Sequence, residues 1–178
     1  MSPSKADAVV ARLLVGNLKF AEKHKSELKK HLAGQTPMAA VLTCSDSRVP
    51  PELIFSAGLG EMFVVRVAGN VALGASVIGS LEYAVEHLRV PLVLVMGHTC
   101  CGALKAAEAG PGDGSCVGDI VTEIRCCFDG GDNLRANVRR QAEKLPERSR
   151  VIADAVKAGG LSVRGAIYHL EAGKVEML

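Results

Sequence analysis

The chain has no tryptophan, and aromatic residues make up only 3% of its 178 residues. Proteins that bind single-stranded nucleic acid stack bases on aromatic side chains, and nucleic-acid-binding proteins in general concentrate positive charge. Here the net charge is only +2, and the strongest lysine cluster is interleaved with Glu22 and Glu27. The scarcity of both features argues against a nucleic-acid partner.

Long hydrophobic runs are also missing, because no apolar stretch approaches the roughly 20 residues that span a bilayer. The N-terminal segment lacks the apolar core of a signal peptide, since Arg12 interrupts Ala8–Leu14. Hydrophobic residues nevertheless make up 48% of the chain, which is enough for a well-filled core. We therefore expect a single domain at residues 1–178, located in the cytoplasm, without a membrane partner.

Several common motifs are absent as well. The chain contains neither GxGxxG nor GxxxxGK[ST], so no dinucleotide or P-loop site is predicted. Its cysteines do not form the CxxC…CxxC pattern of a structural zinc site. Without a secretory signal, we interpret them as reduced thiols, metal ligands or core residues. They are Cys44, Cys100, Cys101, Cys116, Cys126 and Cys127.

Apolar runs that are rich in β-branched residues alternate with helical segments along the chain. Continuous apolar runs are typical of strands that are buried on both faces of a parallel sheet. The predicted strands are Met38–Thr43, Met62–Val67, Val90–Met96 and Leu161–His169, with a short last strand at Lys174–Leu178. The predicted helices of this part are Gly74–Arg89, Thr99–Ala109 and one or two within Leu134–Ala158, around Pro146. The fold class is α/β: a single domain whose mostly parallel central sheet of four strands carries a C-terminal edge strand and is flanked by helices.

Two segments lie outside this alternation. Apolar residues recur at helical spacing from Ala8 to about Leu32, and Gly34 follows as a stop signal. This helix is long for so small a domain, so we predict an N-terminal helical arm at residues 1–34 that packs on a partner subunit, and an α/β core at residues 35–178. The glycine-rich segment Gly110–Asn133 is predicted to be a surface excursion.

Metal-ligating side chains stand at the ends of two predicted strands. Cys44 follows the first run and His98 follows the third. In parallel sheets ligands gather beyond the carboxyl ends of the strands, so these residues converge if the two strands are neighbours. Cys101 lies three residues after His98, where one helical turn would place both side chains on one metal, with Cys100 as a core residue. Two thiolates, one imidazole and an open position are typical of a catalytic zinc site.

A zinc ion with this ligand set carries about zero net charge, so neighbouring groups must help to create hydroxide. Asp46 can accept a hydrogen bond from the zinc-bound water. Arg48 can hold that carboxylate through a charge-assisted pair and keep it from becoming the fourth ligand. We therefore predict Asp46 and Arg48 as catalytic residues of an enzyme that uses a zinc-bound hydroxide on a small electrophile.

Four stretches resemble the β-class carbonic anhydrases, in particular their plant-like subgroup. They are CSDSRVPPE at 44–52, FVVRVAGN at 63–70, SLEYAVEHL at 80–88 and GHTCCGALKAA at 97–107. The resemblance implies one Zn²⁺ per subunit on Cys44, His98 and Cys101, and an Asp46–Arg48 dyad. The candidate substrate-binding residues are Gln35, Phe63, Ala68, Tyr83 and Gly102. The chain departs from the family in lacking the tryptophan near the first cysteine that marks an inhibitory bicarbonate pocket, and in having Val67 where asparagine is usual.

The activity that the resemblance implies is that of a carbonate dehydratase, a zinc lyase. It hydrates carbon dioxide reversibly to bicarbonate and a proton, in a homodimer or tetramer whose subunits share their sites. Two alternatives remain open at this point. One is hydrolysis of carbonyl sulfide or carbon disulfide on the same scaffold, and the other is a non-enzymatic zinc or redox-sensing protein that uses the surplus thiols.

Overall fold

The structure, a computed structural model, describes residues 4–178. The chain divides into two compact units, of which the first ends at Gln35 and the second comprises Thr36–Leu178. The predicted arm at residues 1–34 ends one residue before this division, and its first three residues lie outside the described part. Among residues 4–178, no helix has both the length and the apolarity that crossing a membrane requires.

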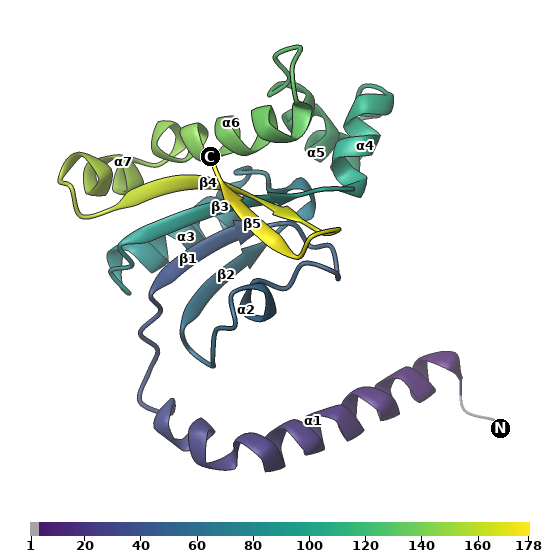
Figure 1. The fold of residues 1–178 in the computed structure, drawn as a ribbon, viewed down its shortest axis with the longest axis vertical. Coiled ribbons are helices and arrows are strands. Elements are labelled where there is room, and N and C mark those ends of the chain that lie inside the picture. The colour runs from purple at the N-terminus through teal and green to yellow at the C-terminus, as the bar shows by residue number, and fades with distance from the viewer. Residues whose placement is uncertain (1–3) are drawn as a thin grey trace. The chain divides into compact units, whose positions relative to one another are not determined.

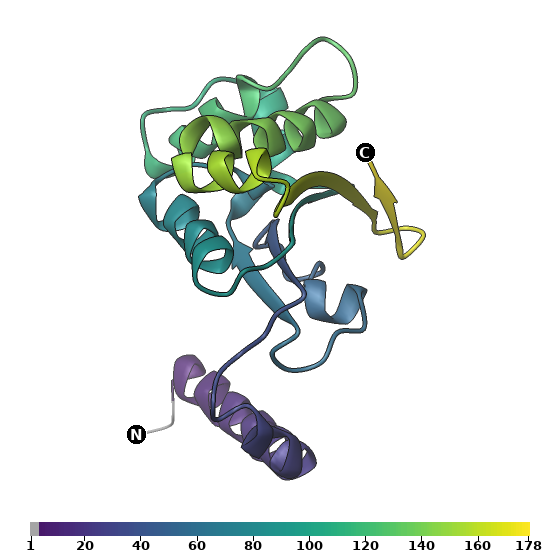
Figure 2. The same ribbon diagram turned by 90° about the vertical axis from the view of Figure 1, so that its left-hand side faces the viewer.

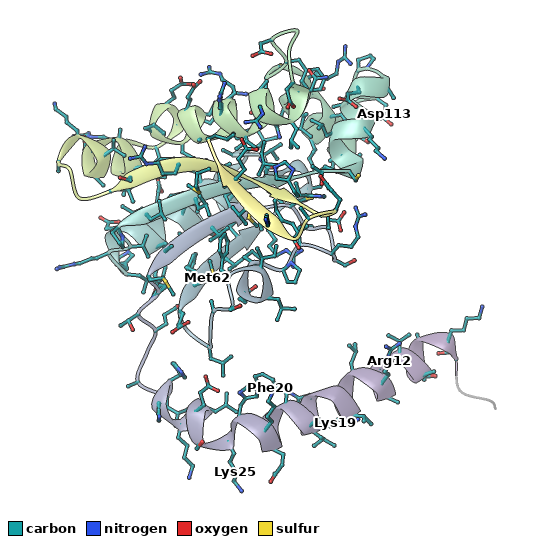
Figure 3. The ribbon with its side chains drawn as sticks, viewed as in Figure 1. Arg12, Lys19, Phe20, Lys25, Met62 and Asp113 are labelled. Atoms are coloured by element: carbon teal, nitrogen blue, oxygen red, sulfur yellow. The ribbon has the colours of Figure 1, made fainter. Side chains whose placement is uncertain are left out.

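The first unit consists mainly of the helix α1, Lys5–Lys30. A capping box starts it: the Ser4 hydroxyl accepts a hydrogen bond from the Asp7 N–H, and the Asp7 carboxylate accepts one from the Ser4 N–H. No residue of α1 is buried. Figure 3 shows Phe20 and Lys19 projecting from different sides of the helix. Several apolar side chains of α1 are more than half exposed, namely those of Val9, Val10, Leu13, Leu14, Val15 and Leu18.

The second unit is built on one five-stranded sheet with the order β2-β1-β3-β4-β5. The pairs β1–β2, β1–β3 and β3–β4 are parallel, and β5 is an antiparallel edge strand, so the predicted sheet is confirmed (Figure 1). Every residue of β1 is buried, as expected for a central parallel strand. The strands are β1 (Ala39–Thr43), β2 (Met62–Arg66), β3 (Leu92–His98), β4 (Ser162–His169) and β5 (Lys174–Met177).

Helices cover the two faces of the sheet unequally. Leu81, Leu145 and Ile152, from three different helices, are fully buried in the main core on one face. The other face carries a smaller cluster around Val41 and Met96, next to the short helix α2 (Figures 1 and 2). The helices of this unit are α2 (Pro51–Ile54), α3 (Ala75–Glu86), α4 (Gly102–Ala109), α5 (Cys116–Arg125), α6 (Asn133–Arg148) and α7 (Arg150–Lys157), with a 3-10 turn, η1, at Ala68–Asn70.

The prediction of a surface excursion at Gly110–Asn133 was wrong in its middle part. Helix α5 occupies Cys116–Arg125, and the Ser115 hydroxyl caps it by accepting a hydrogen bond from the Gly118 N–H. Ile124 of this helix is fully buried and packs with Val71 and Ala107. Glycines dominate the composition on both sides of α5, so the short apolar periodicity inside the segment was masked.

Candidate metal centre

The metal-ligating residues meet at the carboxyl edge of the sheet because β1 and β3 are neighbouring parallel strands. Thr43 of β1 pairs with Met96 of β3. Cys44 is therefore one residue beyond the end of this register, and His98 is two residues beyond it. The order of the strands therefore brings Cys44 and His98 together, as the sequence analysis requires.

Three possible ligand atoms, one each from Cys44, His98 and Cys101, lie within 4.8 Å of one another. The two sulfur atoms are 4.0 Å apart, and tetrahedral geometry with Zn–S bonds of about 2.3 Å places two sulfurs roughly 3.8 Å apart. All three side chains are at most 5% exposed. The set has the donor atoms, spacing and burial that a zinc ion requires.

The hydrogen bonds of His98 leave one ring nitrogen free for a metal. Its Nδ1 lies 2.9 Å from the carbonyl oxygen of Thr99, which can only accept, so Nδ1 carries the proton. The lone pair is then on Nε2, and this buried atom has no hydrogen-bond partner within residues 4–178. In a metal-binding histidine, one ring nitrogen binds the metal and the other is held by a hydrogen bond that orients the ring. The free, buried Nε2 of His98 and its bonded Nδ1 match this arrangement.

His98 and Cys101 do not share a helical turn, contrary to the sequence-based prediction. His98 is the last residue of β3, and α4 begins at Gly102 with Cys101 as its N-cap. Between them the backbone of Cys100 is left-handed, with a φ of 59°. This tight turn, rather than a helix, brings the two ligands together. Cys100 is exposed, so its prediction as a core residue was wrong.

The two thiols differ in acidity. The hydrogen bond with Cys101 lowers the pKa of Cys44, with further help from the N–H of Gly69, whose nitrogen lies 3.4 Å from Sγ. The same contact with the ionised Cys44 raises the pKa of Cys101. One negative charge is therefore already favoured at the site, and a metal cation would ionise the second thiol as well.

Asp46 and Arg48 form the predicted pair beside the ligands. The Arg48 guanidinium donates from Nε and Nη2 to the two carboxylate oxygens, over 2.9 and 2.7 Å. These bonds hold the pKa of the Asp46 carboxyl well below its usual range. The carboxylate oxygen Oδ2 lies 3.9 Å from Nε2 of His98, at the free nitrogen of the ligand set.

Arg66 is a site residue to which sequence reasoning gave no role. It ends β2 opposite Thr43, and its guanidinium donates to the backbone oxygens of Cys44, over 3.0 Å, and of Asp46. It therefore ties the strand end that carries the first thiol to the loop that carries the acid. The available signal was an arginine at the end of an otherwise apolar run.

Within the second unit, the candidate substrate residues are not gathered in one place. Phe63 of β2 and Tyr83 of α3 form an aromatic pair with ring centroids 6.1 Å apart. Phe63 is paired with Ala40, so along the strand it lies roughly 13 Å from Cys44. Ala68 precedes the glycine that contacts Cys44, and Gly102 opens α4 next to Cys101. Gln35 is exposed at the end of the first unit.

Comparison with known proteins gives a consistent result. The family model described as carbonic anhydrase matches residues 39–175. The chain is 37% identical over 179 residues to carbonic anhydrase 2 of Mycobacterium tuberculosis, covering 89% of this chain and 86% of the relative. It is 40% identical over 156 residues to a carbonic anhydrase of Mycolicibacterium smegmatis, covering 80% and 75%.

Solved structures agree in fold. The β-carbonic anhydrase CafA of Aspergillus fumigatus superposes with a TM-score of 0.81 at 28% identity, covering 98% of this chain and 91% of that one. A Coccomyxa β-carbonic anhydrase in complex with acetazolamide gives a TM-score of 0.80 at 28% identity, covering 95% and 86%. The similarity therefore extends through the sheet and its helices.

Proposed function

This chain belongs to the β-carbonic anhydrase family, and from that premise we propose that it catalyses the reversible hydration of carbon dioxide to bicarbonate and a proton. The observation that carries the proposal is the convergence of Cys44, His98 and Cys101, whose ligand atoms lie within 4.8 Å of one another. A zinc ion held by these three residues supplies Lewis acidity, which makes water nucleophilic near neutral pH.

Asp46 is the residue that we assign to the orientation of the attacking water. Its Oδ2 lies 3.9 Å from the ligand nitrogen of His98, so it would accept a hydrogen bond from a water that a metal held by the three ligands would activate. Arg48 keeps the carboxylate in that place through two parallel hydrogen bonds. Without Arg48, Asp46 could turn toward the metal and occupy the open position.

We assign the binding of the apolar substrate to the other predicted residues. Ala68 and Gly102 flank the ligands of their own chain, and the N–H of Gly102 is one of the first helical N–H groups, which lack intrahelical partners. Phe63 lies along the sheet away from its own Cys44, and Tyr83 of α3 forms the aromatic pair with Phe63. We therefore assign these two aromatic residues, together with Gln35, to a site that two subunits complete.

The apolar surfaces that each unit leaves exposed support the proposal of a homodimer. Six large apolar side chains of α1 are more than half exposed, as described above. The second unit has an apolar pocket of about 280 Å³ on the face of the sheet that carries α2. We propose that α1 of one subunit buries its apolar residues against the core of a second copy. The pocket is lined by Met38, Ala39, Val41, Phe55, Ala57, Met62, Leu92 and Leu94.

We also place the protein in the cytoplasm. All six cysteines are unpaired, and thiols of this kind persist in a reducing compartment.

Stopped-flow measurement of carbon dioxide hydration with a pH indicator tests the proposed reaction. The wild type should exceed both Cys44→Ser, which loses a ligand, and Asp46→Asn, which loses the acceptor, by about a hundredfold or more. Cys116→Ser, at an exposed cysteine outside the metal set, is the matched control and should retain the wild-type rate. Equal rates in the wild type and Cys44→Ser would rule the proposal out, and a dominant release of sulfide from carbonyl sulfide would replace it with the sulfur reaction.

A further inference from the structure

Beyond the ligands themselves, a backbone group of the 3-10 turn η1 contacts a metal-site sulfur. The N–H of Gly69 donates to Sγ of Cys44 over 3.4 Å within the buried part of the site. A donor aimed at a ligand sulfur withdraws charge from it, so its placement affects how strongly the sulfur holds a metal ion. The position of Gly69 is therefore a property of the metal site.

Gly69 is held in place from more than one side. Its φ is +68°, a conformation that favours glycine, and a Cβ there would lie 2.5 Å from Cδ1 of Ile124. Ile124 belongs to α5 and is fully buried. Steric contact limits the space around Gly69, but it does not fix the direction of its N–H.

A directional contact comes from α6. The side-chain Nδ2 of Asn137 donates to the carbonyl oxygen of Gly69 over 3.1 Å. The N–H that reaches Cys44 and the carbonyl that Asn137 holds lie on either side of the same Cα. Asn137 is 2% exposed, so this bond is not exchanged for bonds to bulk water.

The orientation of the Asn137 amide is set in turn by Gln141, one helical turn further along α6. The Gln141 Oε1 accepts from the N–H of Ala72 over 2.8 Å, which leaves its Nε2 as the donor on the other side. That Nε2 lies 3.3 Å from Oδ1 of Asn137. The Asn137 oxygen therefore faces Gln141, and its NH₂ group faces Gly69.

We propose that Asn137 is a positioning residue of the metal centre, which acts through Gly69 to hold a hydrogen-bond donor on the Cys44 sulfur. Among the described residues, the hydrogen bonds of its side chain go to Gly69 and Gln141 and not to Cys44, His98 or Cys101. This inference rests on the zinc site proposed above and adds to it a determinant of zinc affinity on a helix that supplies none of the ligands.

Chelator competition on the zinc-loaded proteins tests this assignment. Asn137→Leu keeps approximately the size of the side chain but removes the donor, and its zinc dissociation constant should rise by about 10- to 100-fold. Leu145→Val is the control, because this residue is also fully buried on α6 but belongs to the main core. It should lose stability while its zinc dissociation constant stays within about twofold of the wild type. Equal zinc affinity in Asn137→Leu and wild type would overturn the role of Asn137.

The hydrogen bond from Gly69 to Cys44 can also be measured directly in the wild type, independently of whether any variant folds. In protein loaded with ¹¹³Cd, the bond from Gly69 to Cys44 should give a scalar coupling between the Gly69 amide proton and the metal. The smaller substitution Asn137→Ser should weaken that coupling, whereas Leu145→Val should not. Absence of the coupling in the wild type would overturn the inference. Failure of the wild type to bind one zinc per chain would instead overturn the proposed function.

Discussion

At the scale of single residues, Arg48 decides what Asp46 does. Both carboxylate oxygens of Asp46 accept hydrogen bonds from the Arg48 guanidinium, and Oδ2 of Asp46 lies 3.9 Å from the ligand nitrogen of His98. In Arg48→Ala the carboxylate is free to move onto the metal. We expect hydration activity to fall by at least about tenfold while metal analysis still finds about one zinc per chain. Arg150→Ala, at an exposed arginine of α7, should change neither quantity. An active Arg48→Ala enzyme would contradict this account of the pair.

Gly69 gives a prediction about stability at the same scale. Gly69→Ala places a methyl group against Ile124 at a positive φ, so the free energy of unfolding should fall by about 2 kcal/mol or more. Adding Ile124→Val removes the methyl group that clashes and should restore part of the loss. The control Gly79→Ala, in α3 with open space around it, should be neutral or slightly stabilising. Denaturant unfolding gives the free energy of unfolding of all three variants. A Gly69→Ala protein as stable as the wild type would refute the steric crowding at Gly69.

The sequence predicted the residues that carry chemistry better than those that position them. Cys44, His98 and Cys101 stand out because few roles suit such side chains at strand ends, and the structure brings them together. The contribution of Asn137 depends on one amide hydrogen bond across 68 positions of the chain, which no local pattern encodes. The left-handed turn at Cys100 was missed for a related reason, because it occurs at a residue other than glycine.

At the scale of elements, a buried ion cluster joins α5 to α6. Glu123 accepts from Lys144 over 2.6 Å and from Arg148 over 3.0 Å, and the side chains of Glu123 and Lys144 are 10% and 8% exposed. Burial opposes ionisation of Glu123, but the hydrogen bonds from Arg148 and Lys144 outweigh it and hold its pKa below the usual value. The cluster therefore stabilises the fold fully at pH values above 4.5, the usual pKa of a glutamate side chain. This contribution is lost as the pH falls through the lowered pKa of Glu123.

Glu123→Gln tests the cluster, because it leaves the buried Lys144 without a counter-charge. At pH 7 the free energy of unfolding should fall by about 3 to 5 kcal/mol, and the gap to the wild type should narrow as the pH drops below about 4.5. Glu143→Gln, at an exposed residue of α6, should cost less than about 1 kcal/mol. Chemical unfolding at pH 7 and at a pH below about 4.5 gives these differences in the free energy of unfolding. A difference between Glu123→Gln and the wild type that does not change with pH would contradict the lowered pKa of Glu123.

Helices and strands with a clear hydrophobic pattern were predicted best. The continuous apolar runs of the four parallel strands were unambiguous. The sequence predicted one or two helices within Leu134–Ala158, around Pro146. Two are present, with Pro146 in the last turn of α6 and the break at Ser149. The hydroxyl of Ser149 caps α7 by accepting from the N–H of Ile152, and it also donates to Glu82 of α3. That second contact is tertiary and leaves no trace in the local sequence.

At the scale of the whole molecule, the proposed homodimer depends on the exposed apolar residues of α1. Leu14 and Leu18 lie one helical turn apart, and they are 60% and 70% exposed. The double variant Leu14→Glu, Leu18→Glu should form monomers in analytical ultracentrifugation and lose most of its activity, as should a chain without residues 1–32. Lys19→Glu makes the same change of two units in net charge on the same helix and should remain dimeric. A monomeric chain with full activity would refute the shared site.

The central claim is that Cys44, His98 and Cys101 hold one zinc ion that is required for carbon dioxide hydration. It is tested most directly by adding zinc stepwise to metal-free protein and recording the hydration rate at each step. The account predicts a rate that starts near zero, rises in proportion to zinc and reaches its plateau at one equivalent per chain, with no rise in Cys44→Ser. A rate that is already maximal without zinc, or that climbs equally in Cys44→Ser, would contradict it.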